Sequence, residues 1–311
     1  MEHTTKNYRV SGHESFACRY AWLPKVAHHL QRDHTILTDD SRAMVELGVG
    51  KNMVQSIRFW AQSADIVKAP GKTGKHVLTG FAIELLGERG LDPYLEDIRT
   101  LWLIHWKLAT NVEAPLMAWD YLLNNWQEPE MTQSSVVGAL EKEATKRGSK
   151  LSSTTITKHF EVFLHTYVPT RGRKGTIQED NLDCPLVELE LITRQGERGA
   201  DGPNGRRESI YAFNRDWKPE ISNELFLYSL NDFWQVRHKD EATLSLREVA
   251  HGHGSPGQIF KLPEEDVRSR LEELNNGPNT PFSYAESLHL QQVRRHRAGS
   301  GSELLRHIYR P

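Results

Sequence analysis

The sequence predicts a mainly α-helical α+β protein that contains several winged helix-turn-helix-like units with small β-hairpin wings. Apolar residues recur at helical spacing in many segments of the 311-residue chain, which indicates amphipathic helices. A pair of such segments separated by a short turn occurs about three times. Segments of alternating polarity joined by glycine-rich turns follow two of these pairs, and this pattern is typical of β-hairpins.

The first unit covers residues 1–90 and has the clearest helix-turn-helix pattern. The acidic pair that starts at Asp39 caps a helical segment over 41–47. A glycine turn separates this segment from a second helix that begins at Lys51. A basic hairpin over 65–79 follows. Helix, turn, helix and hairpin is the order of a winged helix, whose second helix commonly enters the DNA major groove.

Residues 91–130 are expected to form a buried helical connector. Asp92 and Pro93 suit the cap and the first position of its main helix. Apolar residues lie on nearly all sides of that helix, which indicates burial. A further helix is predicted over 113–126.

Residues 131–220 repeat the pattern as a second helix-turn-helix with an arginine-rich wing. Two helices within 134–167 flank a short turn that is surrounded by basic residues. Strands over 186–193 and 208–214 are predicted to be joined by a long loop rich in glycine and arginine. The remaining residues, 221–311, are expected to form a C-terminal helical and winged domain.

Composition limits the classes of function. The chain carries 39 Lys and Arg against 41 Asp and Glu, a formal net charge of -2, so nucleic-acid binding would depend on local basic patches. No apolar leader follows Met1 and no apolar run reaches membrane-spanning length, which predicts a cytoplasmic protein without a membrane segment. Cys18 and Cys184 lack a partner motif and are expected to be reduced thiols, and no metal-ligand set is predicted.

The second helix of the first unit carries side chains suited to reading DNA. Asn and Gln can form two hydrogen bonds with adenine, Arg can do so with guanine, and Ser or Lys can hold phosphate. The arginine-rich wing is expected to enter a groove or follow a single strand, and a solvated loop is the alternative. The candidate DNA-binding residues are Lys51, Asn52, Gln55, Ser56, Arg58, Lys72, Lys75, Lys150, Thr154, Lys158, Arg171, Arg173, Lys174, Arg198, Arg206 and Arg207.

Nucleotide-binding loops are not supported, because the stretches around Lys51 and Lys72 both lack the leading glycine of a phosphate-binding loop. Three acids at the start of the connector offer oxygen ligands for Mg²⁺, although the same acids also suit the start of a helix. A histidine and a glutamate near the N-terminus are further candidates for catalysis. The candidate catalytic residues are therefore His13, Glu14, Asp92, Glu96 and Asp97.

A set of motifs distributed over nearly the whole chain resembles a known bacterial family. The motifs are SGHESF at 11–16, GVGKNMV at 48–54, IRFW at 57–60, DPYLED at 92–97, TLWL at 100–103 and SPGQIF at 255–260. Together they resemble proteins from DNA phosphorothioation gene clusters, in particular the SspB-type nicking subunits of phosphorothioation and phage-defence systems.

This resemblance implies a DNA-binding subunit that recognises a short sequence and nicks one strand to allow sulfur incorporation. A nick needs an activated nucleophile and stabilisation of the phosphate, for which Mg²⁺ is the expected metal. Besides DNA, the implied partners are a cysteine desulfurase, an ATPase and an ATP-pyrophosphatase-like sulfur-transfer subunit. A winged-helix transcriptional regulator without enzymatic activity and a scaffold that docks partner proteins are the alternatives.

Overall fold

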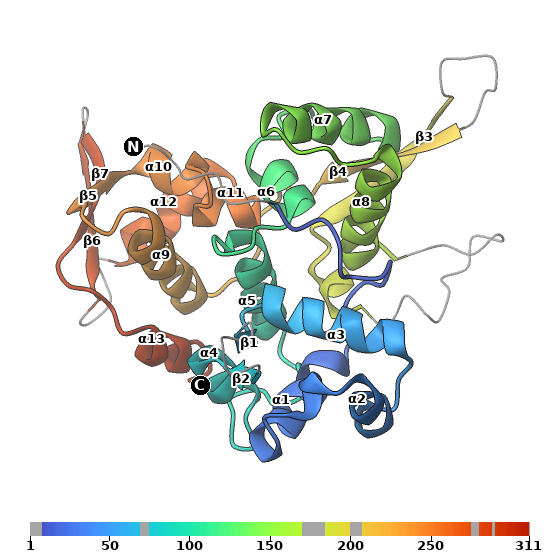
Figure 1. Cartoon of the computed structure of the whole chain (residues 1–311). Helices are drawn as coiled ribbons and strands as arrows, with labels where there is room; N and C mark the ends of the chain where they lie inside the picture. Colours follow the sequence, from blue (N-terminus) through green and yellow to red (C-terminus); the bar gives the residue numbers. More distant parts are fainter. Residues whose placement is uncertain are drawn as a thin grey trace. The chain divides into compact units, whose positions relative to one another are not determined.

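The computed structural model describes residues 8–68, 75–169, 184–199, 207–274, 280–287 and 290–310. Within these ranges, helices combine with small antiparallel sheets of two or three strands (Figure 1), which confirms the predicted α+β class. No helix in these ranges is both long and apolar enough to cross a membrane.

The chain divides into two compact units. The first contains Met1–Leu122 and Trp126–Asn214, and the second contains Leu123–Asn125 and Arg215–Pro311. This division is coarser than the four segments expected from the sequence, and the finer boundaries stay a prediction.

The N-terminal part of the first unit contains two consecutive helices joined by a glycine turn, and a two-stranded antiparallel sheet follows them. Asp39 accepts hydrogen bonds from the backbone N–H groups of Ser41 and Arg42, which confirms the predicted cap. Gly48 follows the helix with a φ of 65°, a left-handed conformation that favours glycine. The elements are α1 (Trp22–Arg32), η1 (Ile36–Thr38), α2 (Asp40–Leu47), α3 (Lys51–Ser63), β1 (Val67–Lys68), β2 (Val77–Leu78) and α4 (Gly80–Leu86).

The rest of the first unit contains the second predicted helix pair and a longer hairpin. Thr132 and Ser152 cap the two helices of this pair through their side-chain oxygens. Figure 1 shows β3 and β4 as a hairpin beside these helices. The elements are α5 (Ile98–Thr110), α6 (Met117–Asn124), α7 (Gln133–Lys146), α8 (Ser153–Tyr167), η3 (Pro185–Leu189), β3 (Ile192–Gly199) and β4 (Arg207–Phe213).

The main connector helix, α5, starts at Ile98, so the predicted start at Asp92 and Pro93 is wrong. Leu95 has a φ of 60°, which no residue inside an α-helix adopts. Asp97 caps the helix instead by accepting the N–H of Arg99. The acidic motif therefore forms a turn that precedes the helix.

The predicted strand over 186–193 is also wrong in its first half. Residues Pro185–Leu189 form a 3₁₀ helix, and Glu190 follows it with a φ of 46°. Strand β3 begins only at Ile192. Leu186, Leu189 and Leu191 are buried, so the apolar alternation in this stretch reflects burial of a turn rather than strand pairing.

The second unit combines helices with a three-stranded antiparallel sheet. Its strands lie in the order β5-β7-β6, so the first strand pairs with the last. Most of the long helix α9 is buried, as the sequence predicts. The elements are α9 (Asn223–Arg237), β5 (Thr243–Ser245), α10 (Leu246–His251), α11 (Pro256–Phe260), α12 (Glu264–Glu273), β6 (Phe282–Ser287), β7 (Leu290–Arg295) and α13 (Gly301–Ile308).

A buried polar contact joins three helices of the first unit. The Tyr167 hydroxyl on α8 accepts a hydrogen bond from Trp119 Nε1 on α6 at 2.9 Å. The same oxygen lies 2.7 Å from His105 Nδ1 on α5. All three side chains are buried. One hydroxyl thus serves two polar groups that would otherwise lose a partner away from water.

We expect Tyr167→Phe to destabilise the protein, because it removes this hydroxyl from both Trp119 and His105. The free energy of unfolding should fall by about 1–3 kcal/mol. Denaturant unfolding at neutral pH measures it. Tyr94→Phe is the matched control, since Tyr94 is 71% exposed and should change stability by no more than about 0.5 kcal/mol. Equal stability of the two variants would contradict a structural role for the hydroxyl.

Candidate nucleic-acid interface and acidic turn

A short turn joins helices α7 and α8, and exposed cations lie in this turn and on α8. The turn after α7 contains Gly148 with a φ of 71°, and beyond its two chain neighbours no heavy atom lies within 4 Å of the position of an added Cβ there. The left-handed backbone is therefore what favours glycine. Lys150 in the turn and Thr154 and Lys158 on α8 are exposed. The structure thus brings three of the predicted DNA-binding residues to the outside of one helix pair.

The wing formed by β3 and β4 is fixed to the segment that precedes α7. The backbone N–H of Met131 donates to the Tyr211 carbonyl at 2.7 Å, and the Tyr211 N–H donates back at 2.9 Å. Along the hairpin the register runs from Ile192↔Phe213 to Gly199↔Arg207. Arg198 and Arg207, both predicted DNA-binding residues, are exposed at its outer end.

Helix α3 presents only part of its predicted reading face. Lys51 and Asn52 are exposed and Gln55 is half-buried. Ser56 is fully buried, so its predicted exposure to DNA is wrong. It shares a helix face with the buried Phe59, three residues later, which turns it toward the core. Arg58 is half-buried and forms an ion pair with Asp40 of α2 at 2.6 Å, so it braces the two helices.

Of the remaining predicted DNA-binding residues in the first unit, one more lies within the described ranges. Lys75, just before β2, is exposed. The other predicted residues lie outside the described ranges, and these are Lys72, Arg171, Arg173, Lys174 and Arg206.

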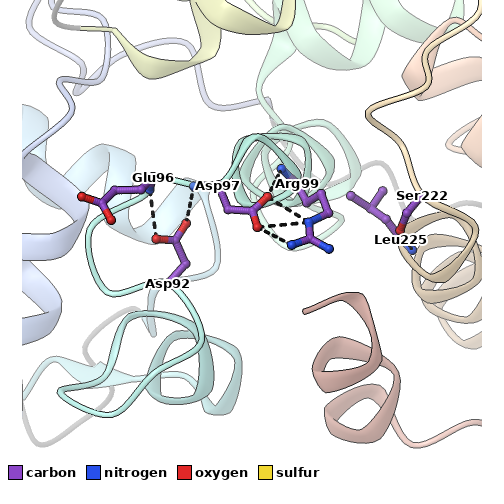
Figure 2. Close-up of polar contacts among 6 residues, drawn as sticks. All are labelled: Asp92, Glu96, Asp97, Arg99, Ser222 and Leu225. Carbon is purple, nitrogen blue, oxygen red and sulfur yellow. Dashed lines mark hydrogen bonds and ion pairs between the residues drawn. The ribbon is translucent and has the colours of Figure 1, made fainter. Parts of the chain in front are cut away.

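The acidic turn before α5 uses two of its three carboxylates internally (Figure 2). Asp92 is buried, and its two oxygens accept the backbone N–H groups of Glu96 and Asp97 at 2.9 and 3.0 Å. Asp97 binds the Arg99 guanidinium. Hydrogen bonds from Arg99 lower the pKa of Asp97, against the effect of burial. Glu96 is exposed.

These contacts are unlike a shared Mg²⁺ site. Among the described residues, no group of three or more His, Cys, Asp or Glu side chains is arranged to hold a metal ion. The predicted trio Asp92, Glu96 and Asp97 therefore does not fit a common Mg²⁺ ligand set. The backbone conformation of the turn accounts for Asp92, and Arg99 accounts for Asp97.

The structure places two further residues beside this turn that the sequence does not single out. The Tyr20 hydroxyl donates to Glu188 Oε1 at 2.9 Å. Burial and this hydrogen bond raise the pKa of Tyr20 to about 12, and the charges of Asp92 and Glu96 act in the same direction. The hydroxyl of Tyr20 therefore remains a hydrogen-bond donor to a higher pH than that of an ordinary tyrosine. Residues so far apart along the chain leave no local sequence signal.

The candidate catalytic residue His13 lies in the core of the first unit. It is buried, stacks on His159 with ring centroids 5.4 Å apart, and packs edge-on against Phe59. His13 Nε2 lies 3.2 Å from His159 Nδ1, while His159 Nε2 accepts the Ala118 N–H. Burial lowers the pKa of both histidines, that of His159 to about 3. The pair is neutral and joins the N-terminal segment to α8.

Glu14 and the two cysteines are the remaining residues that the sequence singles out. Glu14 is exposed and has a φ of 49°, so it lies on a surface turn next to the buried His13. Cys18 and Cys184 are free and buried, as expected for reduced thiols. Burial raises the pKa of both thiols, which keeps them protonated and unreactive at neutral pH.

The chain belongs to a protein family described only as "Protein of unknown function (DUF4007)", whose model matches residues 10–309. Two solved structures share its fold over nearly the whole chain. A "Magnesium ion-bound SspB crystal structure" is 23% identical, with a TM-score of 0.78, and the match covers 97% of this chain and 89% of that one. An "SspB crystal structure" is 25% identical, with a TM-score of 0.79, and the match covers 96% of this chain and 85% of that one.

No curated protein matches this chain significantly. The structural similarity confirms the resemblance given by the sequence motifs. The chain is therefore similar in fold to SspB over nearly its whole length, and the sequence motifs resemble the SspB-type proteins of DNA phosphorothioation systems.

We expect the buried histidine pair to make stability depend on pH. The folded pKa of His159 is about 3, against 6.5 without burial, so the unfolded state binds more protons between these values. The free energy of unfolding is therefore highest above pH 6.5 and falls as the pH drops below it, by up to about 1.4 kcal/mol per pH unit for this histidine.

Denaturant unfolding at several pH values from 7.5 to about 4.5 tests this dependence. His159→Gln should show a shallower pH dependence than the wild-type chain, whatever its stability at pH 7.5. His34→Gln is the control, because His34 is exposed and should leave the dependence unchanged. If the free energy of unfolding of His159→Gln depends on pH as steeply as that of the wild-type chain, this histidine is not the cause of the dependence.

Proposed function

We propose that this chain is the DNA-binding subunit of a DNA phosphorothioation and phage-defence system. In this proposal it recognises a short DNA sequence and nicks one strand to allow sulfur incorporation. The SspB-type fold supports membership in such a system. The partners would be those that the sequence resemblance implies: a cysteine desulfurase, an ATPase and an ATP-pyrophosphatase-like sulfur-transfer subunit.

The arrangement of α7, α8 and the wing carries the DNA-binding part of the proposal. In chain order, α6 is followed by the Met131 bridge, α7, α8, the 3₁₀ helix η3, β3 and β4, and Met131 pairs with the last strand. This is the order of a winged helix, in which the helix after the turn enters the major groove. Lys150, Lys158 and the exposed arginines of the wing are suited to phosphate contacts, and Thr154 is suited to a base or phosphate contact.

Helix α3 provides a second candidate contact within the same unit. Lys51 and Asn52 are exposed at its N-terminal end, which is the end of a recognition helix that commonly contacts base edges. With Ser56 buried and Arg58 paired to Asp40, this contact is smaller than the sequence suggests. We therefore assign α8 and the wing the main part of the DNA contact.

The second unit has a similar order of elements, with three α-helices between its first strand and its last two, but its α12 exposes acidic rather than basic side chains. Its strands lie in the order β5-β7-β6, with α10, α11 and α12 between the first strand and the last two. The exposed side chains of α12 include Glu264, Glu265, Glu272 and Glu273, while its Arg270 is buried against Asp266 at 2.7 Å. Carboxylates repel phosphate, so we do not assign α12 a DNA-reading role.

Nicking with Mg²⁺ rests on the similarity to SspB, one structure of which is described as magnesium ion-bound. The acidic turn does not offer its three carboxylates together, so we derive no catalytic step from it. The alternative is a winged-helix transcriptional regulator, which would bind DNA through the same surface without cutting it.

DNA binding is tested by Lys150→Ala combined with Lys158→Ala. We expect weaker binding to every duplex sequence. The slope of log K against log salt concentration should also become smaller in magnitude by about 2, since each of the two lost phosphate contacts contributes about 0.9 to it. Fluorescence anisotropy with labelled duplex DNA at several salt concentrations measures both. The control is Lys239→Ala combined with Arg247→Ala, which removes two exposed cations of the second unit. It should leave the affinity and the salt slope unchanged. Equal losses in the two double variants would contradict the assigned surface.

Nicking is tested by incubating the purified full chain with supercoiled plasmid and either Mg²⁺ or Mn²⁺. We expect conversion to the relaxed circular form, and none in EDTA, because strand cleavage needs a metal to stabilise the phosphate. Gel electrophoresis separates the two forms. If the plasmid stays supercoiled with both metals while the chain still binds DNA, the enzyme proposal is wrong and the regulator reading is favoured.

A further inference from the structure

The wing of the first unit is attached to the segment 130–134 at three successive points. Glu130 forms an ion pair with Arg198 of β3 at 2.6 Å. Met131 makes the two backbone hydrogen bonds with β4 described above. Ser134, near the start of α7, donates its N–H and hydroxyl to the Glu208 carboxylate of β4, at 3.2 and 2.6 Å.

A fourth contact lies within the hairpin. Glu197 pairs with Arg194 at 2.5 Å and lies 3.9 Å from Arg207 of the opposite strand. Three glutamates therefore neutralise the wing's arginines or occupy polar donors at the start of α7. Arginine guanidinium groups, serine hydroxyls and the N–H groups at a helix N-terminus are the donors that proteins commonly use to hold DNA phosphates.

These ion pairs are exposed and can exchange. The side chains of Arg198 and Glu130 are 63% and 44% exposed, and ion pairs at such positions contribute little to stability. The backbone bridge between Met131 and Tyr211 does not depend on any of the glutamates. The wing can thus lose its acidic partners and still remain attached to the helix-turn-helix.

We propose that Glu130, Glu197 and Glu208 occupy the phosphate-binding groups of the wing in the free protein and are displaced when DNA binds. This inference rests on the proposed DNA-binding function. Each phosphate contact at the wing replaces a glutamate contact, so part of the electrostatic attraction is cancelled. Compared with a wing that lacks these glutamates, the wild-type chain binds DNA of any sequence more weakly. The contacts that read the sequence therefore account for a larger share of its affinity.

The test uses the full chain with Glu130→Gln, Glu197→Gln and Glu208→Gln combined, and labelled duplex DNA of unrelated sequence as the probe. Glutamine keeps a hydrogen-bond acceptor and removes the negative charge. We expect affinity at low salt to rise roughly tenfold or more, because no glutamate contact has to be broken for each phosphate contact formed at the wing, and log K to fall at least as steeply with log salt concentration as in the wild-type chain. Anisotropy titrations at several salt concentrations measure both quantities.

Two controls separate this effect from others. Glu224→Gln, Glu272→Gln and Glu303→Gln combined make the same change in net charge at exposed positions of the second unit, and should raise affinity by less than about twofold. Ser134→Ala loosens the Glu208 contact without removing its charge, and should not raise affinity. Circular dichroism confirms that each variant folds, and Glu130→Gln alone replaces the triple variant if that variant does not.

The outcomes are distinct. A wild-type chain that binds duplex DNA together with a wing variant that binds no more tightly than the control triple would overturn the inference and leave the proposed function intact. Weaker binding by the wing variant would likewise overturn it, because the glutamates would then serve only to hold the wing in place. A wild-type chain that does not bind DNA at low salt would overturn both.

Discussion

The contacts of the buried face of α8 determine which residues of the first unit reach solvent. His159 and Tyr167 lie on that face, and each has a polar partner on another segment: His13 in the N-terminal segment for the first, and Trp119 on α6 for the second. Rotating α8 about its axis would break these buried contacts, at a cost that no surface residue would offset. Thr154 and Lys158 are therefore held on the outside by interactions on the opposite face.

A chain with a net charge of -2 can bind DNA only where its charges are unevenly placed. The first unit exposes Lys150 in the turn before α8, Lys158 on α8 and arginines on the wing, whereas α12 of the second unit exposes glutamates. Acids also lie directly against the wing, as in the pair Arg198–Glu130. Local arrangement rather than total charge thus sets the field that DNA would meet, and the same acids limit how strong that field is.

Local signals in the sequence predicted most helices correctly, since a cap such as Asp39 or Ser152 acts on backbone groups within three residues. The same reasoning failed at Asp92, because a carboxylate that accepts two backbone N–H groups can close a turn as well as start a helix. It also failed at Ser56, whose polarity suggests exposure although the helix face that carries it is buried. The Tyr20–Glu188 contact depends on chain folding over a long separation, and no local pattern reveals it.

DNA binding and strand cleavage would depend on different parts of the first unit. The residues suited to phosphate lie on α8, in the turn before it and on the wing, while three of the four acids predicted to be catalytic lie in the turn before α5. Within that turn, Asp92 holds backbone N–H groups and Asp97 holds Arg99, so replacing either would disturb the start of α5 before any chemistry could be judged. Glu96 is exposed and has neither task. A loss of nicking in a Glu96 variant that keeps its fold and its DNA affinity would therefore point to chemistry, whereas the same loss in an Asp92 variant would not.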